Sequence, residues 1–322
     1  MGAKDPSVTE PRVSILTAAY NHERFIARCV EGVLAQSMGD WELFVFDDGS
    51  TDATCEIVRR YRDPRIVLME HPHTGIWTLG GRYNRALAKA RAPLLAILDG
   101  DDWWPPDKLK IQTPAFEDAE TVLCHGSAVL HDEEGRPLAR RPLLPAMRGR
   151  VRGRDFLEPL LTRRHIPWSP TAMARAAAVR AVGGFVQPSY EPLVDYPTWA
   201  HIAPLGFVRG MTEVLGFYRI RAHSVSRGMA EQVADGNARF VRDFLAGEGA
   251  KAGLSDRRRN LYLRGSEAAH DQELARIRMK QGRAGEARAL FRRAFRSGPP
   301  WLKARSSLRL FQSVFFGTPR SP

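Results

Sequence analysis

Short apolar runs alternate with segments of helical periodicity between residues 12 and 112. Four β-rich runs have the length of strands, at 13–19, 42–48, 65–70 and 94–99. The segments between them repeat apolar residues at helical spacing, around 25–34, 52–61 and 76–90. Apolar strands that alternate with helices indicate a mainly parallel sheet with helices on both faces. Ligands of such sheets bind beyond the carboxyl ends of the strands, so we expect the chemistry there.

The pattern becomes mixed after residue 112. Residues 121–139 predict a hairpin that turns at Glu134 and Gly135. The basic stretch 140–154 contains Pro and Gly and predicts a mobile surface loop. Residues 171–185 predict a strand, a short helix and a Gly-Gly stop, and two closing strands are expected at 207–211 and 213–220. The sequence therefore predicts a second, less regular half of the same α/β domain.

The chain changes character at Gly228, beyond which no strand is expected. Helical periodicity is present there at 239–245, 267–281, 285–296 and 302–316. Residues 282–300 are similar to the second half of a tetratricopeptide-type hairpin, but one such unit does not make an array. We expect an all-α C-terminal region over 228–322.

Composition supports a folded protein. The chain has 322 residues, of which 43% are apolar, with 15 Phe and 7 Trp, so it can bury a sizeable core and is not disordered throughout. No run reaches the roughly 18 apolar residues of a membrane span. Residues 1–11 have no apolar signal-peptide centre and are expected to form a flexible tail. Cys29, Cys55 and Cys124 are scattered, which is typical of buried thiols in a reducing cytoplasm.

The net charge of +12 belongs to the end of the chain. Residues 257–322 contain 16 Lys and Arg against 4 Asp and Glu, whereas residues 1–256 contain 32 of each kind. The bland interpretation is a helical cap with a solvated Arg face. A sharper hypothesis is attachment to an anionic membrane, because 302–316 combines Leu, Phe and Val with Arg. Nucleic acid is a weaker hypothesis, because no nucleic-acid-binding fold is recognisable.

Carboxylates follow two of the predicted parallel strands. Asp47 and Asp48 end one strand, and Asp99, Asp101 and Asp102 end another. The second group would repel itself unless a positive charge lies among its members. A hard divalent cation shared with a nucleotide diphosphate meets that need; solvated turn acids with capping roles are the alternative. The chain has no GxGxxG or GxxxxGK[ST] phosphate motif and no HExxH or GxSxG motif, so acid-rich, metal-assisted chemistry is favoured.

Four ordered blocks resemble glycosyltransferase family 2. The first is VSILTAAYNHERFIARCVEGVLAQSMGDWELFVFDDGSTDAT, and the second is NRALAKARAPLLAILDGDDWWPPDKLKIQ, which carries a DxD motif. The third comprises VGGF at 182–185 and VDYPTWAHIAPLG at 194–206, and the fourth is YRIRAHSVS at 218–226. The resemblance spans about two thirds of the chain, and four blocks at family spacing are far more specific than a lone DxD.

The resemblance implies an inverting hexosyltransferase with a GT-A fold over 12–227, divided into a nucleotide-sugar half (12–125) and an acceptor half (126–227). It implies a donor that is a nucleotide-diphosphate sugar, UDP being favoured, and an acceptor that is a glycan or a lipid-linked molecule. Mn²⁺ or Mg²⁺ would bridge the diphosphate. The enzyme would act in polysaccharide or glycoconjugate biosynthesis in a bacterial cytoplasm, or peripherally at the inner face of the membrane.

The same resemblance assigns individual residues. Asp195 would be the base that accepts the proton of the acceptor hydroxyl. Asp101 and His223 would bind the metal. The nucleotide sugar would contact the remaining group, in which Tyr20 and Asp48 hold the base, Asp99 lies near the ribose and two arginines offset phosphate charge: Tyr20, Asp48, Asp99, Arg219 and Arg221.

Two departures from the family pattern affect the site. Val194 stands where the family usually has Glu, and Ala18 and Ala19 replace the usual Pro, Thr or Ser. Two other functions stay open. A nucleotidyltransferase would also use acidic strand ends and a metal, although it would have no need of the Asp195 block. A non-catalytic sugar-nucleotide-binding or interaction protein would dock through its basic helices.

Overall fold

A computed structural model describes residues 10–221 and 224–300, and the chain divides into two compact units. The first unit contains Phe156 and the described residues before it, with Pro167–Gln187 and Val194–Arg221. The second contains Leu157–Ile166, Pro188–Leu193 and the described residues after Arg221. The segment 302–316, for which a basic apolar helix is expected, lies outside the described residues.

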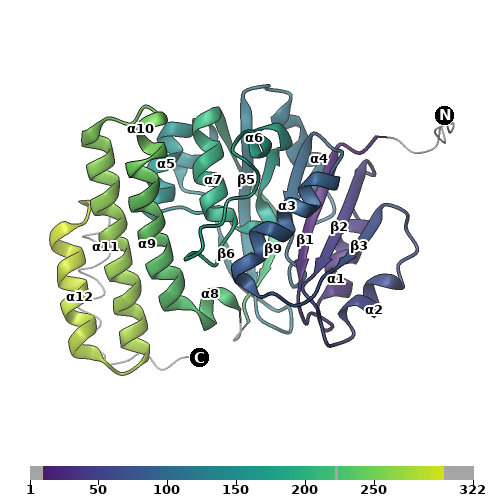
Figure 1. Cartoon of the computed structure of the whole chain (residues 1–322), viewed down its shortest axis with the longest axis horizontal. Coiled ribbons are helices and arrows are strands. Elements are labelled where there is room, and N and C mark those ends of the chain that lie inside the picture. Colours follow the sequence, from purple (N-terminus) through teal and green to yellow (C-terminus); the bar gives the residue numbers. More distant parts are fainter. Residues whose placement is uncertain (1–9, 222–223, 301–322) are drawn as a thin grey trace. The chain divides into compact units, whose positions relative to one another are not determined.

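The first half of the first unit is a parallel sheet with alternating helices (Figure 1). Strand order is β3-β2-β1-β4, and all three pairings are parallel. The predicted strands are confirmed, with bounds that differ by at most two residues. In chain order the elements are β1 (Val13–Ala19), α1 (Ile26–Leu34), β2 (Trp41–Asp47), α2 (Thr54–Arg59), β3 (Ile66–Glu70), a 3-10 turn (Ile76–Thr78), α3 (Leu79–Lys89) and β4 (Leu94–Ile97).

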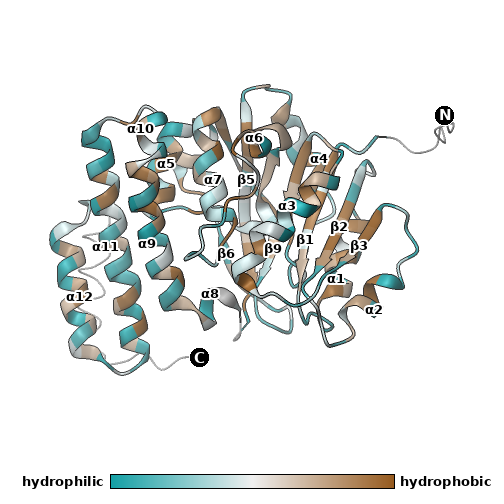
Figure 2. Cartoon of the chain, viewed as in Figure 1, coloured by the Kyte–Doolittle hydropathy of each residue, from teal (hydrophilic) through white to brown (hydrophobic). Residues whose placement is uncertain are grey.

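The central strands are buried on both faces. Ile15 of β1 and Leu43 of β2 pack with Val30 of α1 in one apolar cluster. Successive side chains of a strand point to opposite faces, so the neighbouring positions face the other layer. There Phe46 of β2 meets Tyr83 of α3 edge to face, with ring centroids 4.7 Å apart. Hydropathy shows the same pattern, since β1 and β2 are apolar over most of their length (Figure 2).

The sheet continues beyond β4 in the order β8-β5-β9-β7, and β6 pairs with the end of β5. The pairs β4–β8, β8–β5 and β9–β7 are antiparallel. β5 and β9 are parallel to one another, so the sheet is mixed. The predicted hairpin is confirmed. The elements are α4 (Lys108–Gln112), β5 (Thr121–His131), β6 (Pro137–Arg141), β7 (Gly149–Arg152), α5 (Gly153–Leu161), β8 (Met173–Arg175), α6 (Ala176–Ala181), α7 (Asp195–Ile202) and β9 (Phe207–Arg219), with 3-10 turns at Thr113–Phe116, Pro145–Met147, Ser169–Thr171 and Ala203–Leu205.

Two predictions for this half are wrong in detail. The stretch 140–154 is not a loop, because it contains β7 and buries Leu143 and Met147. Gly210 permits this approach: a Cβ there would lie 1.8 Å from the carbonyl oxygen of Met147. The two closing strands are a single strand, β9, whose register against β5 shifts instead of breaking.

The second unit is helical beyond residue 224. α11 and α12 form a hairpin whose turn includes Gly282 at a φ of 76°. Ala268 packs on Ala294, and Ala275 packs on Phe291, so the small residues of α11 allow the helices to approach closely. The elements are α8 (Val225–Gly228), α9 (Ala230–Ala246), α10 (Glu248–Lys251), α11 (Asp256–Lys280) and α12 (Ala284–Ser297). Within 10–221 and 224–300, no helix is both long enough and apolar enough to cross a membrane.

Candidate active site

The parallel strands bring the predicted site residues to one edge of the sheet. Tyr20 follows β1, Asp48 follows β2, and Asp99 lies two residues beyond β4. Backbone bonds continue past the strand ends: the N–H of Asp48 donates to the carbonyl of Ala19 at 2.9 Å, and that of Gly100 donates to Ala18 at 2.9 Å. The apolar strands therefore position the acidic residues through backbone pairing alone.

The Asp48 carboxylate is buried and surrounded by donors. Its Oδ1 accepts from Arg82 Nη1 at 2.6 Å and from the Thr74 N–H at 3.0 Å. Its Oδ2 accepts from the Gly75 N–H at 3.1 Å and lies 3.2 Å from His73 Nδ1. Burial lowers the pKa of Arg82, but the adjacent Asp48 charge opposes that effect. Asp48 thus organises the turn after β3.

Tyr20 presents an aromatic ring at the same edge. It is 40% exposed, and its ring stacks on His73 with centroids 4.3 Å apart and planes 24° apart. His73 is held in turn by the carbonyl of Asp48, 2.9 Å from Nδ1. One face of Tyr20 is therefore covered by a side chain that Asp48 positions, and a planar ligand would use the other face or displace His73.

Asp99 lies in a strongly acidic environment. Burial, together with the charges of Asp101 and Asp195, raises the pKa of Asp99 to about 7. The hydroxyl of Tyr83 lies 3.4 Å from Asp99 Oδ1. Asp195 is the first residue of α7, where Oδ2 accepts from Ser169 Oγ at 2.9 Å and Oδ1 accepts from the Tyr196 N–H at 2.7 Å. Burial also raises the pKa of Asp195. The structure thus brings the base predicted at 195 within electrostatic reach of the DxD segment.

Asp101 forms an ion pair across the sheet edge. Its Oδ2 accepts from Arg221 Nε at 2.6 Å. Arg221 Nη2 lies 2.9 Å from His22 Nε2, and burial lowers the pKa of His22. The arginine that follows β9 therefore reaches the carboxylate predicted to bind a metal.

Asp102 and Arg219 are buried against each other. Asp102 Oδ1 accepts the backbone N–H of Arg219 at 2.7 Å, while Oδ2 is buried and has no hydrogen-bond partner. Burial raises the pKa of Asp102 well above its usual value, and the charges of Asp101 and Asp99 add to this effect. The Arg219 guanidinium donates to the carbonyl oxygens of Asp101 and Glu133. These contacts fix the DxD segment to the end of β9.

The donor set fits a hard divalent cation in part. The carboxylates after β4 are crowded, and Asp99 and Asp102 have raised pKa values. Asp102 Oδ2 has no hydrogen-bond partner among the described residues. An added positive charge would therefore stabilise this cluster. No group of three or more His, Cys, Asp or Glu side chains with metal-binding geometry occurs among the described residues. A cation that takes one or two protein carboxylates and substrate phosphates matches this arrangement. Of the two predicted metal ligands, Asp101 lies in this cluster, and His223 lies outside the described residues.

Several residues at the site were not predicted from the sequence. Arg82 and His22 partner Asp48 and Arg221, and Ser169 partners Asp195. Their sequence signal is weak, because each partner is separated from its carboxylate or arginine by 26 or more positions. Trp103 and Trp104 are buried, and the Trp104 indole donates to the Pro170 carbonyl at 2.7 Å, so both serve packing.

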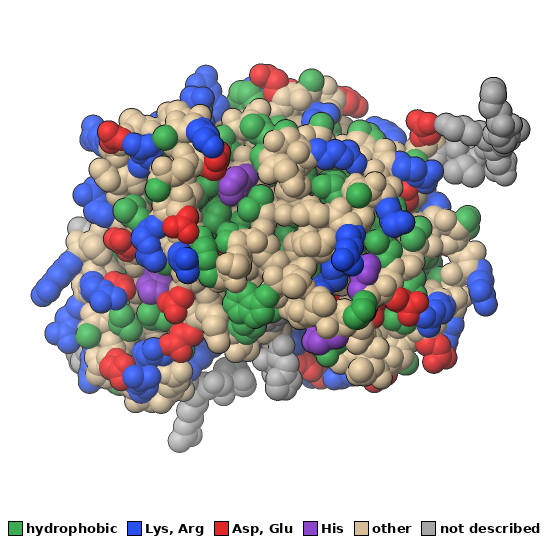
Figure 3. All heavy atoms as spheres, viewed as in Figure 1, with side chains coloured by type: hydrophobic (Ala, Val, Ile, Leu, Met, Phe, Trp, Pro, Cys, Tyr) green, Lys and Arg blue, Asp and Glu red, His purple; other side chains and the backbone are tan. Residues whose placement is uncertain are grey.

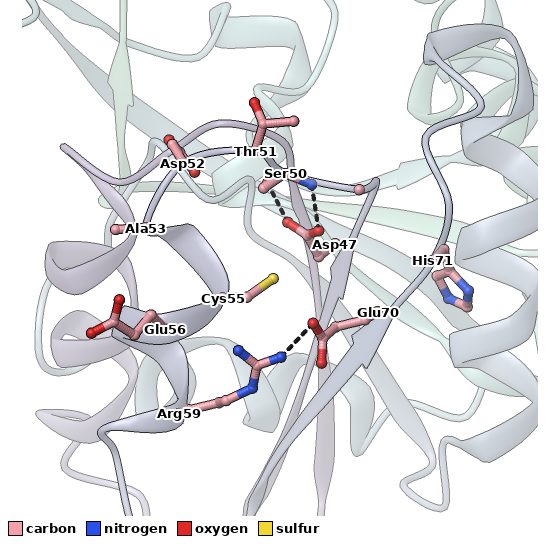
Figure 4. Close-up of a pocket in the computed structure, with 11 residues that line it drawn as sticks. Asp47, Ser50, Thr51, Asp52, Ala53, Cys55, Glu56, Arg59, Glu70 and His71 are labelled. Carbon is pink, nitrogen blue, oxygen red and sulfur yellow. Dashed lines mark hydrogen bonds and ion pairs between the residues drawn. The ribbon is translucent and has the colours of Figure 1, made fainter.

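A separate cavity of about 480 Å³ lies beside the ends of β2 and β3 (Figure 4). Cys55 and Glu70 point into it, and Arg59 forms an ion pair with Glu70. Asp47 lines it while accepting from the Ser50 N–H at 2.7 Å. Burial raises the pKa of Cys55 to about 12, so this thiol is not a nucleophile at neutral pH. None of the predicted site residues lines this cavity.

Comparison with known proteins identifies the family. Residues 14–183 match Glycosyl transferase family 2. The putative teichuronic acid biosynthesis glycosyltransferase TuaG of Bacillus subtilis (strain 168) is 28% identical over 228 residues, which cover 67% of this chain and 82% of TuaG.

Two solved structures are similar in fold. The S. aureus TarS 1–349 structure in complex with UDP-GlcNAc has a TM-score of 0.63 at 16% identity, covering 91% of this chain and 83% of that one. Mannosyltransferase PcManGT from Pyrobaculum calidifontis, in complex with GDP-Man and Mn²⁺, has a TM-score of 0.60 at 19% identity, covering 98% and 83%. These likenesses confirm the predicted GT-A-like fold, a mixed and mainly parallel α/β sheet followed by C-terminal helices. The chain belongs to glycosyl transferase family 2 and is a glycosyltransferase, as its sequence motifs predict.

Proposed function

We propose that the enzyme transfers a hexose from a UDP-sugar to an acceptor hydroxyl with inversion at the anomeric carbon, in the assembly of a polysaccharide or glycoconjugate. TuaG, a relative over two thirds of this chain, is named for teichuronic acid biosynthesis, and TarS has been solved with UDP-GlcNAc. The name of TuaG supports a sugar-polymer role, and the TarS complex supports a UDP-sugar as donor. The PcManGT complex contains GDP-Man, so the nucleotide base of the donor is a point for experiment.

The observation that carries this proposal is the position of Asp195. Its carboxylate is held by Ser169 and by the Tyr196 N–H, burial raises its pKa, and its charge acts on Asp99 of the DxD segment. An alcohol is a poor nucleophile until a positioned base takes its proton. In the proposed reaction the acceptor oxygen bonds to the anomeric carbon, its proton passes to Asp195, and the bond to the diphosphate breaks. The electron pair of that bond leaves with the nucleoside diphosphate.

The donor would lie along the strand ends that precede Asp195. Tyr20 offers a ring face for the base, and Asp48 would accept a base N–H. Asp99 would lie near the ribose, and Arg219 and Arg221 would offset phosphate charge. Asp101, with His223, would hold Mn²⁺ or Mg²⁺, which when bound stabilises the negative charge that develops on the leaving diphosphate.

The helices of the second unit would carry the enzyme to an anionic membrane surface. Figure 3 shows Lys and Arg side chains over α11 and α12. The exposed basic residues of these two helices are eight: Arg257, Arg258, Arg264, Arg276, Lys280, Arg292, Arg293 and Arg296. A glycan or lipid-linked acceptor at the cytoplasmic face of the membrane fits this charge. The three cysteines are free thiols, which is typical of a reducing compartment.

A thermal-shift panel of nucleotide sugars, with and without Mn²⁺, tests the donor. Ligand that binds the native state raises stability with concentration, so a UDP-sugar is expected to raise the melting temperature more with Mn²⁺ than without it. Product analysis with the best donor and a hydroxyl acceptor then tests the reaction. Transfer of a nucleotidyl group would identify a nucleotidyltransferase instead. Donor binding without turnover on any acceptor would favour a non-catalytic binding protein.

A further inference from the structure

The guanidinium of Arg221 is held between two side chains of the candidate site. Its Nε donates to Asp101 Oδ2 at 2.6 Å, and its Nη2 lies 2.9 Å from His22 Nε2. The Arg221 and Asp101 side chains are 21% and 10% exposed, so the ion pair is largely removed from water. Contacts on two of its nitrogens give the guanidinium a defined position beside the carboxylate.

Arg221 has a different role from Arg219, the arginine two positions before it. The Arg219 guanidinium donates to the backbone carbonyls of Asp101 and Glu133 and so serves to fix the chain. Among the ion pairs of residues 10–221 and 224–300, the one that involves a carboxylate of the 99–102 segment is that between Arg221 and Asp101. Arg221 therefore supplies a direct cationic partner for Asp101, one of the crowded carboxylates that follow β4.

On the basis of the proposed function, in which Asp101 binds a divalent cation, we propose that Arg221 is a built-in competitor for that cation. Its guanidinium donates to Asp101 Oδ2, a carboxylate oxygen that the cation would use. A second positive charge at the same oxygen is disfavoured by repulsion, so Arg221 leaves Asp101 when the cation binds. A diphosphate offers the displaced guanidinium a charged, bidentate partner.

This competition couples the cation to the donor. A cation that arrives alone must displace Arg221. Its apparent affinity is the intrinsic affinity multiplied by the fraction of enzyme in which Asp101 is free. A donor diphosphate removes that cost by accepting the guanidinium. By linkage, the cation raises the affinity for the nucleotide by the same factor as the nucleotide raises the affinity for the cation. The enzyme would thus acquire its cation together with its substrate.

His22 is the positioning residue for this arrangement. Its Nε2 faces Arg221 Nη2, and because a guanidinium has only N–H donors, this ring nitrogen accepts from the arginine. Burial also lowers the pKa of the ring. Its Nδ1 is packed so closely against Gly100 that a Cβ there would lie 2.8 Å away. The turn between β4 and Asp101 therefore helps to fix the ring that orients Arg221.

Mn²⁺ binding to the full chain tests the proposal without any turnover. The electron paramagnetic resonance signal of free aqueous Mn²⁺ measures affinity, first without nucleotide and then with saturating UDP. Arg221→Gln keeps a polar side chain and removes the charge. It is expected to bind Mn²⁺ alone at least about 10-fold more tightly than the wild type. The wild type is expected to gain at least about 10-fold from UDP, and Arg221→Gln is expected to gain less.

Two further variants make the outcome decisive. Arg209→Gln removes an exposed arginine of β9, the strand that precedes Arg221, and should behave as the wild type. Adding Asp101→Asn to Arg221→Gln should abolish the gained Mn²⁺ affinity, and a gain that persists would overturn the proposal. If Arg221→Gln melts cooperatively but binds Mn²⁺ no more tightly than the wild type, the proposal is also overturned. This holds even if UDP promotes Mn²⁺ binding in the wild type. If UDP promotes no Mn²⁺ binding in any variant, the metal role in the proposed function fails as well.

Discussion

Arg82 Nη1 lies 2.6 Å from Asp48 Oδ1, and both side chains are almost completely withdrawn from solvent. A buried ion pair is strongly destabilised when one partner is removed, because the other charge is left uncompensated. Arg82 also donates to the carbonyl of Gly75 at 2.9 Å, so it ties Asp48 to the turn that positions His73. The end of the proposed site that would bind the nucleotide base therefore depends on the side chain of Arg82, a residue of α3.

Replacing Arg82 with Met is expected to lower the free energy of unfolding by about 3–5 kcal/mol. Urea denaturation monitored by fluorescence measures the loss. Arg85→Met, an exposed arginine of the same helix, is the matched control and should change stability by less than about 0.5 kcal/mol. Equal effects of the two substitutions would mean that the Asp48 ion pair contributes nothing specific.

Asp195→Asn removes the proposed base and keeps the shape of the side chain. Turnover is expected to fall by about 10²–10⁴-fold, while the melting shift caused by the donor stays unchanged. Steady-state transfer assays and thermal shift measure the two quantities. Asp155→Asn, another acid in the first turn of a helix, is the control. Near-normal transfer by Asp195→Asn with intact donor binding would show that the base lies elsewhere.

The sequence predicts those parts of the fold and site that depend on residues close together along the chain. β1, β2 and the Gly-Gly stop at 183–184 were predicted because apolar runs and glycines act within a few residues. The 140–154 stretch was mispredicted because β7 is held by β9, a distant strand.

The same distinction applies to the site. Asp48 and Asp101 lie in motifs that resemble those of glycosyltransferase family 2, so the sequence alone makes them candidate site residues. Their partners Arg82 and Arg221 lie 34 and 120 positions away, and only the packed sheet brings them to the carboxylates. Sequence patterns thus made these acids candidates and named Arg221 as a phosphate partner, but they did not predict the pairing of Arg82 with Asp48 or of Arg221 with Asp101.

Ser169→Ala is expected to move the acidic limb of the pH–rate profile. Burial raises the pKa of Asp195, and the Ser169 hydrogen bond partly opposes that rise. A base must be ionised, so activity is lost as the pH falls through this raised pKa. Without the hydroxyl the pKa rises further, and the acidic limb should shift to higher pH with little change above it. A limb that stays fixed or moves to lower pH would contradict this assignment.

Vesicle binding tests the basic helices. Arg292→Gln with Arg296→Gln removes two exposed charges from one face of α12, and each basic residue near an anionic surface contributes about 1 kcal/mol. Cosedimentation with phosphatidylglycerol vesicles should weaken by about 10-fold or more, and salt should weaken it further. Arg60→Gln with Arg62→Gln, on the first unit, is the control. Equal binding to neutral phosphatidylcholine vesicles would argue against an electrostatic contact.

Lys108 is expected to make the free energy of unfolding depend on pH. It begins α4, is fully buried, and its Nζ has no hydrogen-bond partner, lying only over the Trp104 ring at 3.9 Å from the centroid. Burial lowers the pKa of Lys108 to about 7 from its usual 10.5. The unfolded chain therefore binds the proton more strongly than the native state, so this residue makes stability rise between about pH 7 and pH 10.5. At pH 7 and below, the charge is buried at nearly its full cost.

Lys108→Met is expected to raise the free energy of unfolding by about 1–3 kcal/mol at pH 7, because it fills the same space without a buried amine. The gain should shrink as the pH approaches 10, where the unfolded lysine also loses its proton. Urea denaturation at both pH values measures it. Lys110→Met, an exposed lysine of the same helix, should leave the pH dependence unchanged. A loss of stability in Lys108→Met would mean that the cation–π contact with Trp104 outweighs the desolvation of the amine.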